Sequence, residues 1–399
     1  MNKALYNDCL EIVNNSIKEV QPAKAIQKTL KNFNMPKGNV YLIAIGKAAY
    51  TMAKETIKHI KIKKGIVITK YGHSKEKLTN IDIYEAGHPI LDKNSIDATE
   101  KAISLTKELR ENDAVIFLVS GGGSSLFESP RISLEELQDI NDQLIKSGAS
   151  IQEINTIRKK LSKVKGGRFA EMCSPAKVFN IIISDVVDNS IDMIASGPTV
   201  ADMPVLNAAT IIKKYNIKIS DNTRKYINST CVQRLNNVET YIPLDNESLK
   251  LAAEKACEKL GYMTNYVYLP LICDINDAEK ILLGYINNIK PNNAIILGGE
   301  VVLNVKGQGL GGRNQELALR AGRYIKDKNT AIVCVGSDGN DGPTDAAGAY
   351  VDKSIINNEV NSYLENNDSY NYHKKNKSLI ITGPTGTNVC DLYIIIRKW

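Results

Sequence analysis

The sequence contains no pattern typical of a disulfide framework or of a zinc site. Its seven cysteines are scattered, odd in number and never spaced as C-x-x-C, so we expect buried thiols. The four histidines are equally dispersed, which argues against a histidine-rich metal centre. Only His88, in AGHPILD, has a distinctive setting, and a turn residue before Pro89 is its simpler interpretation.

Long apolar runs, aromatic clusters and concentrated charge are also missing. No apolar stretch approaches the roughly 20 residues of a membrane-spanning helix, and the first residues lack the apolar core of a signal peptide. Aromatic residues make up only 6% of the chain, and the net charge of +7 is spread along it. These features predict a cytoplasmic protein that binds neither membrane nor nucleic acid and has a mild preference for anionic small molecules.

The composition that is present suits a globular protein with two cores. At 399 residues, with 43% hydrophobic and 24% charged residues, two domains are the natural expectation. Strands and helices alternate through the first half, which predicts a parallel sheet covered on both faces. The helices expected there cover 6–20, 46–60, 95–110, 134–146 and 151–164, and the strands cover 40–46, 65–70, 81–87, 114–120 and 177–184.

The pattern weakens over 207–244, and we interpret this polar stretch as the passage to a second domain. Beyond it, helices at 247–260 and 277–289 alternate with short apolar strands, so the second domain is also α/β. The tract 365–378, rich in asparagine and lysine, is interpreted as a solvated loop.

Two glycine-rich segments mark the second half, KGQGLGGRNQE at 306–316 and VGSDGNDGPTDAAG at 335–348. Each follows an expected strand, and their glycines, arginine and aspartates favour a polyphosphate with its metal. The first also contains G-x-G-x-x-G, which alone would indicate a dinucleotide fingerprint. That fingerprint needs one parallel strand before it, whereas GGE at 298–300 resembles a turn inside a hairpin. A purely structural glycine turn is a further alternative.

Loops after the strands of the first half carry residues suited to an anion. Gly46 and Lys47 lie at a strand-to-helix turn, and SGGGSS at 120–125 follows a buried strand, where three glycines allow a ligand to approach the backbone. Local sequence leaves Lys47 open between a phosphate ligand and a surface lysine. No P-loop motif is present, and the serines do not fit the G-x-S-x-G pattern of a nucleophile.

A basic and an acidic segment follow. Segment 158–170 (RKKLSKVKGGRFA) gathers cations around Gly166 and Gly167, which suits it to hold a phosphate or a carboxylate, with a solvated basic helix as the alternative. Asp185 and Asp188 come directly after an expected strand. Ligands of open α/β sheets bind outside the carboxyl ends of the strands, so this position is favourable.

Eight blocks of sequence, in this order, resemble the type II glycerate kinases, the glycerate 2-kinase family with a C-terminal MOFRL domain. The blocks are AIGKAAYTMA, AGHPILD, SGGGSS, RKKLSKVKGG, SDVVDNSIDMIASGPT, GGEVVLNVKGQGLGGRNQE, GSDGNDGPTDAAGA and TGPTGTNVCDL. The chain departs from many relatives at Lys160 and Cys390, which leaves the local roles of these two positions open. The resemblance implies a large Rossmann-like, three-layer domain with a parallel sheet over 1–240, a smaller α/β MOFRL domain over 241–399, and an active site in the cleft between them.

The resemblance also implies an ATP-dependent kinase that phosphorylates D-glycerate to 2-phospho-D-glycerate, with ATP as co-substrate and Mg²⁺ as the metal. Lys47 and Arg313 are the implied catalytic pair, and phosphoryl transfer suits them because it needs charge stabilisation more than covalent help. Asp185 is the candidate base for the substrate hydroxyl. The candidate nucleotide- and substrate-binding residues are Gly46, Ser120, Gly121, Gly122, Gly123, Ser124, Lys165, Gly166, Gly311 and Gly312.

The candidate ligands of Mg²⁺ are Asp338, Asp341 and Asp345, because this ion takes oxygen ligands, although each is equally well explained as a turn former. Two other functions stay open: a nicotinamide-dependent hydroxypyruvate reductase, and a non-catalytic sensor of phosphorylated metabolites. The residues leave open the position that is phosphorylated, the nucleotide and metal preference, and the oligomeric state, a homodimer included.

Overall fold

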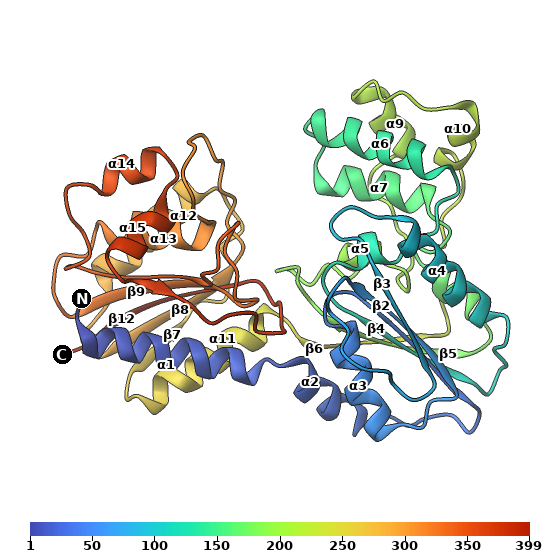
Figure 1. Cartoon of the computed structure of the whole chain (residues 1–399), viewed down its shortest axis with the longest axis horizontal. Coiled ribbons are helices and arrows are strands. Elements are labelled where there is room, and N and C mark those ends of the chain that lie inside the picture. Colours follow the sequence, from blue (N-terminus) through green and yellow to red (C-terminus); the bar gives the residue numbers. More distant parts are fainter. The chain divides into compact units, whose positions relative to one another are not determined.

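The structure, a computed structural model, describes all 399 residues and divides into two compact units (Figure 1). The parallel-sheet unit comprises Ala25–Ser184 and Asn189–Pro243, and the mixed-sheet unit comprises Met1–Lys24, Asp185–Asp188 and Leu244–Trp399. The main division, at Pro243, lies close to the expected boundary at 240. Two short segments, 1–24 and 185–188, differ from that expectation, because they pack with the C-terminal sheet. None of the helices has the length and apolar character needed to cross a membrane.

The parallel-sheet unit is built on six strands in the order β3-β2-β1-β4-β5-β6. Its central strands β1 and β4 are buried along their whole length, as expected for a sheet covered on both faces. The pairs from β3 to β5 are all parallel, which confirms the predicted α/β class and parallel sheet. The strands are β1 (Val40–Ile45), β2 (Lys64–Lys70), β3 (Ile81–Ala86), β4 (Ala114–Val119), β5 (Lys177–Ile183) and β6 (Val238–Leu244).

Helices cover this sheet and also form a separate cluster. The helices in the connections are α2 (Pro22–Leu30), α3 (Ala49–His59), α4 (Lys93–Thr106), α5 (Gly123–Leu126) and α8 (Arg168–Met172), with a 3₁₀ turn at Ile194–Ser196. The cluster consists of α6 (Leu134–Lys146), α7 (Ile151–Leu161), α9 (Ala208–Lys214) and α10 (Asp221–Ile227), which lie together in Figure 1. An apolar core of its own, mainly isoleucine and leucine, holds this cluster together.

The interpretation of 207–244 as an interdomain passage is wrong for most of its length. This stretch contains α9, α10 and the edge strand β6, and its isoleucines join the core of the helical cluster. Both helices are only seven residues long and expose one face. So short an amphipathic pattern is too weak to be detected in the sequence.

The mixed-sheet unit contains six strands in the order β11-β10-β9-β12-β8-β7. Only β7 and β8 are parallel, and every other neighbouring pair is antiparallel. The strands are β7 (Met263–Tyr266), β8 (Asn293–Gly299), β9 (Thr330–Gly336), β10 (Gly348–Asp352), β11 (Leu379–Ile380) and β12 (Asp391–Arg397). The helices are α1 (Lys3–Glu19), α11 (Asn246–Lys259), α12 (Ile275–Asn288), α13 (Arg313–Gly322), α14 (Val360–Glu365) and α15 (Ser369–Lys375).

Helix α1 belongs to the mixed-sheet unit because its apolar face is buried there. It lies along α11 (Figure 1), with Leu5, Cys9 and Ile12 completely buried. The N–H of Asn2 donates to Oδ2 of Asp352 at 2.5 Å. The helix itself was expected from the sequence, but its partner lies more than 200 residues away along the chain. All seven cysteines are free thiols, and five of them are buried.

Two interpretations of the second half are corrected by this fold. The segment after Gly299 is not the returning arm of a hairpin, because it runs beside 271–274 through parallel bridges at Leu271–Gly299 and Asp274–Val302. The tract 365–378 is not a solvated loop, because it contains α15, with Tyr372 and His373 buried. The charged residues on the exposed side of α15 make this tract look like a loop in the sequence, although its other side is buried.

Candidate active site

Arg313 is the first residue of α13, and two carboxylates hold its guanidinium. Nε and Nη2 donate to the two carboxylate oxygens of Asp391 at 2.6 and 3.1 Å, and Nη1 lies 2.8 Å from Oε1 of Glu300. Asp391 is 1% exposed, whereas Glu300 is 44% exposed. The bidentate contact with a buried carboxylate fixes the orientation of the guanidinium. The contact with Glu300 can exchange with solvent or with another anion.

Asp185 lies near this pair in the mixed-sheet unit. Its carbonyl oxygen accepts from Sγ of Cys390 at 3.1 Å. Burial raises the pKa of Glu300, and the carboxylates of Asp391 and Asp185 add to this rise while Arg313 opposes it. The structure thus brings together two of the three predicted catalytic residues, Arg313 and Asp185. It adds Glu300 and Asp391, which the sequence analysis did not single out although both lie in the blocks that carry the resemblance.

The glycine-rich loop 306–312 is bound by segment 366–368 of the same unit. Five consecutive backbone N–H groups of the loop, from 306 to 310, donate to this segment at 2.8–3.0 Å. Lys306 and Gly307 donate to Oδ1 of Asn367, Gln308 to Oδ1 of Asn366, Gly309 to the carbonyl of Asn366, and Leu310 to Oδ1 of Asp368. The N–H groups that a pyrophosphate would need are therefore already occupied.

The glycines of this loop allow the close approach of segment 366–368. A Cβ at Gly307 would lie 2.2 Å from the carbonyl oxygen of Asn366, and a Cβ at Gly309 would lie 2.4 Å from Cβ of Asp368. Both distances are far below van der Waals contact, so only glycine fits at these positions. The G-x-G-x-x-G pattern is thus explained by packing within the unit, which argues against a dinucleotide fingerprint.

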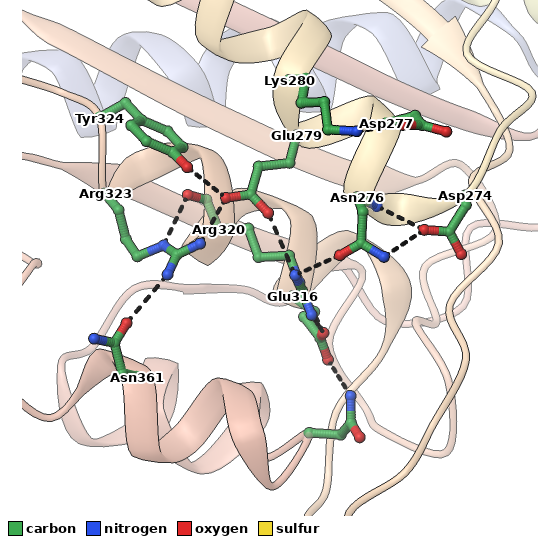
Figure 2. Close-up of polar contacts among 11 residues, drawn as sticks. Asp274, Asn276, Asp277, Glu279, Lys280, Glu316, Arg320, Arg323, Tyr324 and Asn361 are labelled. Carbon is green, nitrogen blue, oxygen red and sulfur yellow. Dashed lines mark hydrogen bonds and ion pairs between the residues drawn. The ribbon is translucent and has the colours of Figure 1, made fainter.

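A buried ionic network anchors segment 366–368 to α12 and α13 (Figure 2). Glu316, which is 1% exposed, accepts from Nδ2 of Asn367 at 2.8 Å and from Nη2 of Arg320 at 2.7 Å. Arg320 also lies 3.3 Å from Glu279, and Glu279 accepts from Arg323 at 2.6 Å. The network therefore fixes the loop that leads directly into Arg313.

Asp341 of the second glycine-rich segment caps the start of α13. Its carboxylate accepts from the N–H groups of Asn314 and Gln315 at 3.0 and 2.8 Å, and from Nε2 of Gln315 at 3.0 Å. Burial raises its pKa to about 6, and these donors oppose the rise. A Cβ at Gly312 would lie 2.2 Å from Cγ of Asp341, and one at Gly311 would lie 2.3 Å from Oγ of Ser369. Both glycines are needed for packing around the cap.

The three aspartates predicted to bind Mg²⁺ do not form a metal site. Asp341 caps α13, Asp345 accepts from the hydroxyl of Tyr370 at 2.7 Å, and Asp338 accepts from the N–H of Asn340 at 3.1 Å. No group of three or more histidine, cysteine or acidic side chains is placed so that it could hold a metal ion. Each carboxylate serves a cap, a turn or a side-chain contact, and the Mg²⁺ role of any one of them stays a prediction.

We expect Asp341→Ala to lower the free energy of unfolding by about 2–4 kcal/mol, because it leaves buried N–H donors at the start of α13 without an acceptor. Urea denaturation measures this loss. Asp338→Ala is the control, with an expected loss below about 1 kcal/mol because its carboxylate accepts within an exposed turn. A variant at 341 that keeps its stability but loses Mg²⁺ affinity would restore the metal role.

In the parallel-sheet unit, the loops after β1 and β4 are joined at the carboxyl edge of the sheet. The N–H of Lys47 donates to the carbonyl of Gly121 at 2.9 Å, and the N–H of Ala48 donates to Oγ of Ser120 at 3.0 Å. Gly46 has a φ of +109°, and a Cβ there would lie 2.3 Å from the carbonyl oxygen of Ser120. Gly46 and the buried Ser120 therefore join the two loops, and this contact places Lys47 at the edge where ligands of such sheets bind.

Gly122 brings Lys47 and His88 close together. It has a φ of +91°, and a Cβ there would lie 2.9 Å from Cδ2 of His88 and 3.5 Å from Cγ of Lys47. Nδ1 of His73 lies 3.1 Å from the carbonyl oxygen of Lys47. Burial, followed by the charge of Lys47, lowers the pKa of His88 to about 4. His88 is thus part of the surroundings of Lys47.

Lys165 is completely buried below the 120–125 loop. Its Nζ lies 2.8 Å from the carbonyl oxygen of Ser124, 3.2 Å from that of Phe127 and 2.5 Å from Oε2 of Glu128. Burial lowers the pKa of Lys165, and the carboxylate of Glu128 opposes this shift. The structure assigns Lys165 to the support of this loop, in place of the ligand contact expected from the sequence.

The rest of the basic segment 158–170 is also largely internal. Nζ of Lys159 pairs with Asp192 at 3.0 Å and with Asp202 at 3.3 Å, and Arg168 donates to the carbonyl of Lys159 at 2.6 Å. Lys160 contacts the carbonyl of Ser229 and Sγ of Cys231. Protein groups therefore satisfy the cations that the sequence suggested for gripping an anion.

The remaining candidates, Gly123, Ser124 and Gly166, all contact the turn at 194–197. A Cβ at Gly123 would lie 2.6 Å from Cβ of Ala195, Oγ of Ser124 lies 3.2 Å from Oγ of Ser196, and the N–H of Gly166 donates to the carbonyl of Ser196 at 3.1 Å. Ala195 and Ser196 both have positive φ, at +52° and +60°. Such strained backbone gathers at functional sites, and here it supports the 120–125 loop.

Comparison with known proteins covers both halves of the chain. A family model described as a domain of unknown function, DUF4147, matches residues 8–228, and the MOFRL family model matches residues 293–391. The D-glycerate 2-kinase of Thermotoga maritima is 44% identical, with 98% of each chain covered. The crystal structure of glycerate kinase from the same organism has a TM-score of 0.94 at 42% identity, covering 99% of this chain and 100% of that chain.

A protein of Agrobacterium vitis named putative hydroxypyruvate reductase is also similar, at 35% identity over 90% of this chain and 88% of that protein. The resemblance carried by the eight sequence blocks is confirmed by these matches. With one family model over more than half of its residues and a full-length relative at 44% identity, the chain belongs to the glycerate kinase family that carries a C-terminal MOFRL domain.

Proposed function

We propose that this protein is a glycerate 2-kinase that transfers the γ-phosphoryl group of ATP to the 2-hydroxyl group of D-glycerate. The observation that carries the proposal is the match to a D-glycerate 2-kinase along 98% of both chains. The arrangement around Arg313 supports it, because an arginine fixed by a buried carboxylate and lying beside an exchangeable one is suited to a phosphoryl group.

Lys47 and Arg313 are the proposed catalytic cations. Phosphoryl transfer depends mainly on positioning and on neutralising charge at the transferred group. The ammonium group of Lys47 and the guanidinium of Arg313 would each neutralise part of this charge. Glu300 would give up Nη1 of Arg313 to a phosphoryl oxygen, while Asp391 keeps the guanidinium oriented.

Asp185 is the proposed general base. Its carboxylate would accept the proton of the 2-hydroxyl group as the oxygen attacks phosphorus, and the nearby Arg313 would stabilise the charge that develops. The same neighbourhood contains Glu300 and Asp391. Asp185 comes two residues after the end of β5 at Ile183, at the carboxyl end of a parallel strand, and this position supports the role.

ATP is the proposed co-substrate, and Mg²⁺ would enter with its phosphates. Protein sites for this ion commonly supply one or two carboxylates and leave the remaining positions to phosphate and water. The predicted aspartate triplet does not fit this role, so no step depends on it. The proposal places the enzyme in the cytoplasm with D-glycerate and nucleotide as partners, and light scattering would test a homodimer.

Two assays test the proposed reaction. ADP release with D-glycerate supports the kinase, whereas NADH oxidation with hydroxypyruvate and no ADP release would establish the reductase in its place. Ligand binding with neither activity would favour the metabolite sensor. Phosphorus NMR of the product distinguishes 2-phosphoglycerate from 3-phosphoglycerate, and a 3-phosphate product would overturn the proposed position.

A further inference from the structure

Four basic side chains gather at the carboxyl edge of the parallel sheet. Lys47 follows β1, Lys70 ends β2, His73 comes three residues later, and His88 follows β3. Lys47, Lys70 and His73 all act on the charge of His88. Four separate positions in the sequence thus contribute positive or potentially positive groups to one place.

Gly122, which follows β4, forms one wall of this basic cluster (Lys47, Lys70, His73 and His88). Only glycine fits at position 122, because a Cβ would lie 2.9 Å from Cδ2 and 3.0 Å from Nε2 of His88. The stem of Lys47 lies on the same side, with Cγ 3.5 Å from that position. The imidazole and the stem of Lys47 therefore both lie beside Gly122, which is partly exposed between the buried Gly121 and Gly123.

Two carboxylates lie near the cluster, and both already accept hydrogen bonds. Glu85 acts on His73 and accepts from the N–H and the hydroxyl of Ser74 at 2.9 and 2.7 Å. Asp92 lies beside Gly87, where a Cβ would be 3.1 Å from its Cγ, and it accepts from the N–H of Gly87 and from the hydroxyl of Tyr71 at 2.6 Å. Burial and the three basic neighbours together keep His88 neutral, since they lower its pKa to about 4.

We propose that His88 is a ligand of the anionic group that binds beside Lys47 at the 120–125 loop, and that its imidazole takes up a proton when this anion binds. The proposal rests on the proposed kinase function for the identity of the anion, either the carboxylate of D-glycerate or a nucleotide phosphate. An anion within a few ångströms favours the charged form of histidine. The bound anion would raise the pKa of His88, whereas Lys47 and Lys70 lower it. The positive charge that the imidazole gains would then strengthen its hydrogen bond to the anion.

The sign of the pH effect follows from this geometry. In the free protein His88 is neutral above about pH 4. In the complex its pKa rises toward or above the ordinary value of about 6.5. Binding at pH 6 therefore takes up as much as one proton, and affinity for the anion weakens as pH rises through the pKa of the complex.

Calorimetric titration at pH 6, in two buffers with different heats of ionisation, measures the uptake directly. D-glycerate and ADP are titrated separately, which distinguishes the two sources of the anion. We expect uptake with one of them in the unaltered protein. In His88→Gln we expect no uptake and affinity for that ligand about tenfold lower, which is the loss of one charge-assisted hydrogen bond. His59→Gln is the matched control, because His59 pairs with Glu55 on the surface of α3.

Proton uptake that is absent with both ligands, or that persists in His88→Gln, would overturn the proposal. If that variant does not fold, NMR titration of the unaltered protein replaces it, because four histidines give few ring signals to follow. A His88 ring signal that keeps its low pKa with ligand bound would also overturn it. Failure of the kinase proposal is separate: it shows as no ADP release, with proton uptake unaffected.

Discussion

Turnover of the Arg313→Ala protein is expected to fall by about 10³-fold, the effect of removing an arginine that stabilises a phosphoryl transition state. We expect this loss because the guanidinium of Arg313 is held in one position and orientation. Asp391 fixes the guanidinium at the start of α13 through two hydrogen bonds. Steady-state ADP release with saturating D-glycerate and ATP measures the loss.

Arg397→Ala is the control for this variant, because Arg397 ends β12, the strand that begins with Asp391, and its guanidinium pairs with Asp327 at 3.4 Å. It should keep turnover within about twofold, since both side chains of this pair are about one-third exposed or more. Arg313→Lys should recover only part of the activity, because lysine cannot reproduce the bidentate contact with Asp391. Near-normal turnover in Arg313→Ala would refute the catalytic role.

Lys47→Ala is expected to lower turnover by about 10²-fold, with a smaller effect on the Michaelis constant of ATP. A preorganised donor aimed at the developing charge contributes about this much. The joined loops after β1 and β4 supply the preorganisation, because the N–H of Lys47 and the side chain of Ser120 hold the turn in place. A loss confined to the Michaelis constant would instead assign Lys47 to binding alone.

Lys54→Ala is the matched control for Lys47. Lys54 lies on α3, two turns beyond Lys47, and its only ion pair is with Glu76 on the surface. The variant removes the same charge from the same helix region and should leave turnover unchanged. Equal losses in both variants would point to the general positive charge of this region and not to a catalytic lysine.

Most secondary structure of the parallel-sheet unit could be predicted, since its strands are buried on both faces and its helices are long enough to show their period. Strands β1 and β4 and helix α6 agree with the expected ranges to within a residue. The short α9 and α10 and the late strands β10 and β12 were not recognised. Helices α9 and α10 are too short to show a period, whereas β12 (DLYIIIR) has the apolar, β-branched run of a buried strand and could have been predicted.

For the candidate site, too, the sequence predicted the residues better than it predicted their contacts. The sequence marked Lys47, Arg313 and Asp185 through motifs, and it left Gly307 and Gly309 open between a phosphate-binding segment, a dinucleotide fingerprint and a structural turn. In the structure those glycines pack against segment 366–368, about 60 residues later. A glycine that admits a ligand and one that admits another part of the chain look alike in sequence, because both require only the absence of a side chain.

The sequence by itself determined the family, the α/β class and the glycine, lysine and arginine positions of the candidate site, since these depend on local pattern and on ordered motifs. Only the tertiary structure decided what each charged group faces. It paired Arg313 with Asp391 and Glu300, buried Lys165 on Glu128, turned Asp341 into a helix cap and placed His88 beside Lys47. The physical reason is that the partner of a charge is set by distance in space, which the order of residues along the chain does not contain.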